Sequence, residues 1–198
     1  MRKKPLKTNE KMNNKRKRVI YLLLILLCIT VLLGAIFIAS SNWLVSDLYT
    51  AFVLSFIGIS FLYVSGLILC TFFLYLCSVI VIFNPQKIKK SSVINFAIVG
   101  IITLVLSLFL LNVSVNESIK AFHDIEAYSN EEWQVKEMVV TGLYRGGGLH
   151  NGPGVLIDTV EGELSLHWES SLIQVGEKYR FTYLDATNTI IDMEKITK

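Results

Sequence analysis

Three long stretches of this chain contain no charged residue, and they constrain its fold more than any other feature. They cover residues 19–46, 48–86 and 91–116, and each is rich in Leu, Ile, Val and Phe. A helix needs about 20 apolar residues to cross the hydrocarbon core of a bilayer. A soluble domain within 198 residues could not bury three such segments. The sequence therefore predicts an integral membrane protein.

We expect transmembrane helices at about 19–41, 54–83 and 93–115. The middle stretch exceeds one span, but two spans would leave fewer than about 20 residues for each helix and no turn between them. Pro85 has no amide donor and disfavours helix at Asn84, so one long or tilted helix is expected to end there. An arrangement of four spans is the alternative.

Basic residues are unevenly placed along the chain. Residues 1–18 contain nine Lys or Arg and one acid, Glu10, and Lys87, Lys89 and Lys90 follow the second predicted span. Such residues stay on the cytoplasmic side of a membrane. We therefore expect a multi-pass protein of the cell membrane with a basic cytoplasmic tail at 1–18, a membrane region at 19–115 and an extracytoplasmic C-terminus.

The predicted spans contain no Asp, Glu, Lys, Arg or His. Ionisable residues at membrane depth mark ion pathways, so their absence argues against a transporter acting alone. Cys28, Cys70 and Cys77 all lie inside spans, which leaves no disulfide and no Cys-based metal motif for the C-terminal region. Cys70 and Cys77 are seven residues apart on one helix face and are interpreted as packing positions.

Residues 116–132 predict a short amphipathic helix that connects the third span to the rest of the chain. Its apolar residues recur at every third position, at Ile119, Phe122, Ile125 and Tyr128. This spacing is close to the helical period.

Residues 133–198 change to the two-residue alternation of β-strands. Strands are expected at 133–145, 154–160, 163–168, 178–184 and 188–196, with a helical turn at 169–175. This order is that of a five-stranded OB-like barrel, although other five-stranded sheets share it. The fold class is therefore an α+β membrane protein: three transmembrane helices followed by a small, mainly β extracytoplasmic domain. The expected core contains Val139, Leu156, Leu164, Leu166, Phe181 and Ile190.

A small barrel tethered to spans resembles the layout of the NfeD family of membrane proteins. The resemblance covers about the last third of the chain and includes glycines at Gly152, Gly154, Gly162 and Gly176.

The segment Arg145–Gly154, with the sequence RGGGLHNGPG, joins the first two predicted strands. In an OB-like barrel this loop flanks the binding face. We interpret Arg145, His150 and Asn151 as candidate partner-binding residues. A plain flexible connection is the alternative, because Gly-rich loops are common between strands.

The residue patterns indicate neither catalysis nor a bound cofactor. His123, His150 and His167 share no metal-ligand spacing, and Ser170 and Ser171 lack a nucleophile motif. Residues 116–198 hold seven basic and 14 acidic residues, a net charge of −7 that would repel nucleic acid. The basic tail is expected to bind anionic membrane lipid.

We therefore expect a non-enzymatic membrane protein whose exported β domain binds a protein or peptide partner at the cell envelope. Two alternatives are an accessory or immunity factor of an export system that acts through its spans, and an envelope sensor that signals through the basic tail. The Lys-, Ile- and Asn-rich composition indicates a bacterium of low genomic GC content. The sequence leaves the partner and the oligomeric state open.

Overall fold

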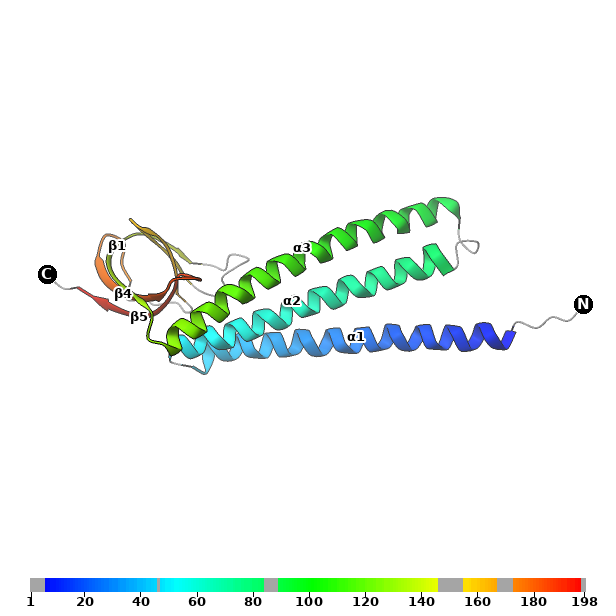
Figure 1. Ribbon diagram of the computed structural model, residues 1–198, viewed down its shortest axis with the longest axis horizontal. Helices are drawn as coiled ribbons and strands as arrows, with labels where there is room; N and C mark the ends of the chain where they lie inside the picture. Colours follow the sequence, from blue (N-terminus) through cyan, green and yellow to red (C-terminus); the bar gives the residue numbers. More distant parts are fainter. Residues whose placement is uncertain (1–5, 46, 84–88, 146–154, 167–172, 197–198) are drawn as a thin grey trace, which may run out of the picture. The chain divides into compact units, whose positions relative to one another are not determined.

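The computed structural model describes residues 6–45, 47–83, 89–145, 155–166 and 173–196. Three long helices come first in the chain and five strands follow (Figure 1). The elements are α1 (Leu6–Trp43), α2 (Leu48–Ser78) with a π-helical turn (Val79–Phe83), α3 (Lys90–Ser129), β1 (Gln134–Arg145), β2 (Val155–Thr159), β3 (Gly162–Leu166), β4 (Lys178–Leu184) and β5 (Thr189–Lys195).

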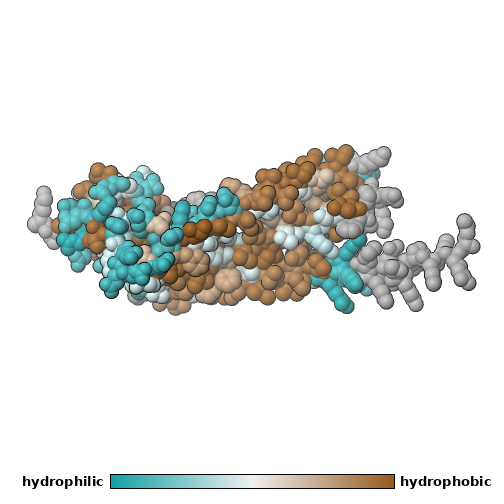
Figure 2. Space-filling view, viewed as in Figure 1, coloured by the Kyte–Doolittle hydropathy of each residue, from teal (hydrophilic) through white to brown (hydrophobic). Residues whose placement is uncertain are grey.

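All three helices are long and apolar enough to cross a membrane. The qualifying segments are Asn14–Trp43, Leu48–Ile82 and Ser91–Ser129. Hydrophobic residues cover the surface of the helices, whereas hydrophilic residues gather over the strands (Figure 2). The middle stretch is continuously helical from Leu48 to Phe83, as one long helix requires. Part of the basic tail is also helical, because α1 already begins at Leu6.

The second helix begins earlier than predicted, at Leu48 rather than near residue 54. Asp47 precedes its first turn, and the Asp47 carboxylate accepts hydrogen bonds from Thr50 N at 2.8 Å and Thr50 Oγ1 at 2.5 Å. These bonds cap the helix by satisfying an amide that has no partner within it. The bonds from the Thr50 side chain and backbone also lower the pKa of Asp47 below its ordinary value of 3.8.

The third span and the predicted connecting helix are one helix. Helix α3 has 40 residues and is therefore about 60 Å long. Its end has the hydrogen bonds of a Schellman motif, from Glu132 N to Ala127 O at 2.8 Å and from Glu131 N to Tyr128 O at 3.2 Å. Glu131 has a φ of 59°, a left-handed conformation that glycine usually fills.

The predicted apolar face of this connecting segment is only partly correct. Ile119 is exposed, whereas Ile125 and Tyr128 pack against other residues. Phe122 is largely exposed, but its ring meets the Phe56 ring edge-on with centroids 5.7 Å apart. At about 100° per residue, a side chain nine positions further along the helix points to the opposite side. A three-residue repeat therefore cannot keep Ile119 and Tyr128 on one face.

The chain packs into two units, and the first contains residues 1–33 and 61–114. In this unit α2 and α3 approach each other at glycines. A Cβ placed on Gly66 would lie 3.5 Å from Leu110, and one on Gly100 would lie 3.4 Å from Cys77. Cys70 and Cys77 are both buried, which confirms their interpretation as packing positions.

The second unit contains residues 34–60 and 115–198. Here α1 and α2 cross closely at Gly58. A Cβ at that position would lie 2.7 Å from Ile38 Cγ1 and 3.0 Å from Gly34 O. Small residues permit such close approach between membrane helices. Ser55 and Ala51 lie about one and two turns before Gly58 and are also buried.

The five strands of the second unit close into a barrel in the order β1-β2-β3-β5-β4 (Figure 1). The first part of β1 pairs with β4 and its second part with β2, both antiparallel, and β3 meets β5 in a parallel pair. The five predicted strands are confirmed to within a few residues at each end. The last two residues of the predicted strand 163–168 and residues 169–172 of the predicted helical turn at 169–175 lie outside the described part of the chain.

The barrel core differs from the prediction on β1 and β2. Leu164, Leu166, Phe181 and Ile190 are buried as expected. Val139 is 37% exposed, however, and the buried residues of these strands include Met138, Val140 and Ile157 instead of Val139 and Leu156. The pairing of β1 shifts register between Val140 and Gly142, so its alternation reverses along the strand. On β2 the apolar run Val155–Ile157 conceals which residues face inward.

Candidate functional site

The loop predicted to bind a partner lies largely outside the described residues. Arg145 is the last residue of β1, and its backbone pairs with Val155. His150 and Asn151 belong to 146–154, which the structure leaves undescribed. The structure does describe β1, which ends at Arg145, and β2, which begins at Val155, and therefore the outer face of these two strands.

The outer face of β1, β2 and β3 carries two cross-strand rows. Register places Tyr144, Leu156 and Ser165 in one row, and Gly142, Asp158 and Glu163 in the next. These side chains point away from the core, because Val155, Ile157, Leu164 and Leu166 on the same strands are buried. Tyr144 is 62% exposed. An aromatic ring therefore lies beside two carboxylates on this face.

Asp158 is poorly satisfied by its own fold. Its Oδ1 atom is buried without a hydrogen-bond partner. Glu163 lies directly opposite, and like charges at that position destabilise a sheet. Gly142, the neighbour of Asp158 on β1, leaves room for the Asp158 carboxylate, because a Cβ at position 142 would lie 3.1 Å from Asp158 Oδ2. The arrangement can accept hydrogen bonds from a cationic group.

A second polar site holds the barrel on α3. Asp124 is 1% exposed, and its carboxylate accepts hydrogen bonds from the backbone of the β4–β5 turn. Ala186 N lies 3.0 Å from Oδ1 and Thr187 N lies 2.9 Å from Oδ2, while Thr187 Oγ1 makes a short bond to Oδ2. Three donors thus compensate a carboxylate removed from water.

The network continues into the start of β5. The Oγ1 atoms of Thr187 and Thr189 lie 2.7 Å apart. Because the Thr187 hydroxyl proton is directed at Asp124, Thr189 is the donor in this pair. Asn188 completes the turn with a φ of 54°. Sequence reasoning missed this site, since Asp124 looks like any other charge on an amphipathic helix.

Apolar contacts surround the Asp124 network. Leu184, at the end of β4, is fully buried against Phe52 of α2 and Ala121 of α3. Tyr49 and Tyr128 stack with ring centroids 3.4 Å apart, and Tyr128 also meets Trp133 at 5.7 Å. Stacked aromatic pairs contribute about 0.5–1.5 kcal/mol beyond their buried area. The barrel is therefore packed on helix ends within this unit.

Ion pairs cover the outside of β1, β4 and β5. Hydrogen bonds from Lys178 and then Arg180 lower the pKa of Glu137, with contacts of 2.8 and 3.0 Å. A hydrogen bond between Glu177 and Lys195 lowers the pKa of the acid and raises that of the base. Exposed pairs of this kind contribute little individually and orient the strand surface.

The described residues contain no group of three His, Cys, Asp or Glu placed to hold a metal ion. Comparisons with known protein families, with curated proteins and with solved structures found no match to this chain.

Proposed function

We propose that this chain is a multi-pass membrane protein whose C-terminal barrel, of OB type, lies outside the cytoplasm and binds a protein or peptide partner. Three apolar helices and the basic residues before α1 and after α2 support this membrane arrangement. The strand order, with β1 shared between β2 and β4, supports the OB type.

The observation that carries the proposal is the incompletely satisfied acidic face of β1, β2 and β3. Barrels of OB type bind ligands on the strand 2–3 face and with the β1–β2 and β4–β5 loops. Here the β4–β5 turn is engaged by Asp124 of α3. The face that carries Tyr144, Asp158 and Glu163 therefore remains for a partner, together with the adjoining connection at 146–154.

The chemistry of this face favours a basic segment of the partner. A Lys or Arg side chain of the partner would relieve the repulsion between the carboxylates of Asp158 and Glu163. Tyr144 offers an exposed ring on which such a cation can stack. Arg145, His150 and Asn151 would add contacts from the connection. The net charge of −7 over residues 116–198 agrees with a basic protein rather than nucleic acid.

Photo-crosslinking in living cells tests this proposal. A photoreactive amino acid at position 144 should give one adduct of discrete mass. Asp158→Lys should abolish that adduct through charge repulsion, whereas Asp192→Lys on β5 makes the same charge change at an exposed site and should preserve it. If no adduct forms, or if both reversals act alike, the face does not bind and the spans or basic tail carry the function.

A further inference from the structure

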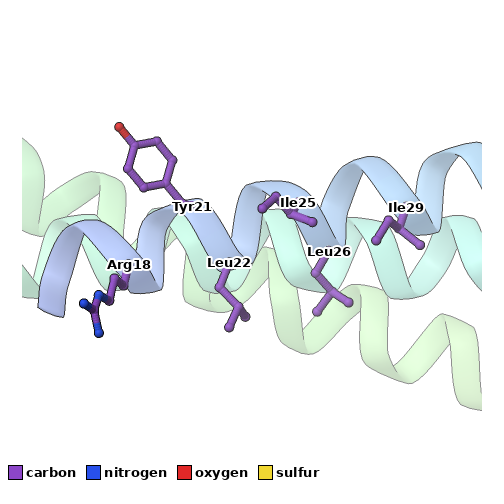
Figure 3. A pocket seen from close by; sticks show the side chains of 6 residues that line it. All are labelled: Arg18, Tyr21, Leu22, Ile25, Leu26 and Ile29. Atoms are coloured by element: carbon purple, nitrogen blue, oxygen red, sulfur yellow. The ribbon is translucent and has the colours of Figure 1, made fainter.

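A shallow groove runs along the first part of α1. It has a volume of about 370 Å³ and is lined by Arg18, Tyr21, Leu22, Ile25, Leu26 and Ile29. Figure 3 shows Arg18, Leu22 and Leu26 in one row along the helix, and their neighbours Tyr21, Ile25 and Ile29 form the next row. Leu22 and Ile25 are each more than 60% exposed, so the groove opens to the surroundings.

The polar atoms of the lining side chains all lie at one end of the groove. The Arg18 guanidinium and the Tyr21 hydroxyl mark that end, and the four residues that follow are Leu or Ile. The groove therefore has a cationic head and an apolar body.

The length of the groove matches one leaflet of a bilayer. From Arg18 to Ile29 the helix rises about 16 Å at 1.5 Å per residue. Half of a hydrocarbon core of about 30 Å is about 15 Å. An acyl chain whose headgroup lies at the level of Arg18 can therefore extend along the whole groove.

We propose that this groove is a binding site for one anionic phospholipid. The lipid phosphate pairs with the Arg18 guanidinium, which presents several N–H donors to phosphate oxygens. The Tyr21 hydroxyl lies at headgroup level, where Tyr is favoured. One acyl chain lies against Leu22, Ile25, Leu26 and Ile29. This inference is independent of the partner-binding function of the barrel and of which side of the membrane α1 begins on.

Native mass spectrometry of the full chain from a neutral detergent tests the site. Titration with phosphatidylglycerol should give one lipid per chain at concentrations where phosphatidylcholine leaves the chain unoccupied. Arg18→Gln should weaken phosphatidylglycerol binding about fivefold, which corresponds to about 1 kcal/mol. Leu22→Trp should weaken it at least as much, because the indole occupies the groove.

Two matched variants separate the groove from general effects. Lys15→Gln removes the same charge nearby, and Leu24→Trp adds the same ring at an exposed position of α1 that does not line the groove. Each should change binding less than twofold. Equal losses for Arg18→Gln and Lys15→Gln, or equal binding of both lipids, would overturn the site. Displacement of the lipid by inorganic phosphate, or a dimer that replaces lipid in the groove, would overturn it as well.

Discussion

Asp124 joins α3 to the β4–β5 turn of the barrel through hydrogen bonds. Asp124→Ala removes the acceptor of two backbone amides, and hydrogen bonds to a charged group contribute about 1.5–3 kcal/mol each. We expect the free energy needed to open the β4–β5 turn to fall by about 3 kcal/mol or more. Hydrogen exchange of the Ala186 and Thr187 amides should accelerate accordingly, whereas Glu126→Gln, an exposed change on α3, should leave it unchanged. Unaltered protection in Asp124→Ala would show that apolar packing alone holds the turn.

Glu131 is strained at the end of α3. The left-handed backbone conformation of a non-glycine residue such as Glu131 costs about 1–2 kcal/mol. Glycine avoids this strain, but its larger loss of conformational entropy on folding lowers stability by about 0.5–1 kcal/mol. Glu131→Gly should therefore stabilise the protein by about 0.5–1 kcal/mol, measured as a higher denaturant midpoint in detergent. Glu132→Gly, the matched change one residue later, should be destabilising. A loss of stability in both variants would contradict the strain.

The barrel should lose stability in acid because of its surface pairs. Folding lowers the pKa of Glu137 and Glu177 below their ordinary value of 4.5. Their contribution is therefore complete above about pH 4.5 and is lost as the pH falls through the lower folded-state values. The melting temperature of the barrel, followed by its β signal in circular dichroism, should fall as the pH decreases through that range. In a Glu137→Gln, Glu177→Gln double variant the melting temperature should fall less. The same acid slope in parent and variant would assign the effect to other carboxylates.

Single elements were predictable wherever a local pattern determines them. Uncharged runs locate the helices because a bilayer excludes charge, and two-residue alternation locates the strands. The sequence could not show which residues of β1 face the core. The register shift after Val140 arises because β1 pairs with two different strands, β4 and then β2. The Asp124 contact joins residues more than 60 positions apart, so no local pattern marks it. The early start of α2 had a readable signal in Asp47, three residues before Thr50.

In the whole molecule as we propose it, Asp124 holds an OB-type barrel on the helix ends, and the barrel faces the outside of the cell. This attachment would hold the Tyr144–Asp158–Glu163 face in one orientation and so lower the entropy lost when the proposed partner binds. The claim that everything else depends on is that the barrel and the basic start of α1 lie on opposite sides of the membrane.

Labelling of single introduced cysteines with a membrane-impermeant maleimide tests that claim directly. The natural cysteines lie in the apolar helices, so the parent chain serves as the blank. Asp192→Cys, exposed on β5, should react in intact cells or spheroplasts, whereas Lys15→Cys should react only after the membrane is permeabilised. Protection of position 192 until permeabilisation, or reaction of position 15 in intact cells, would contradict the account.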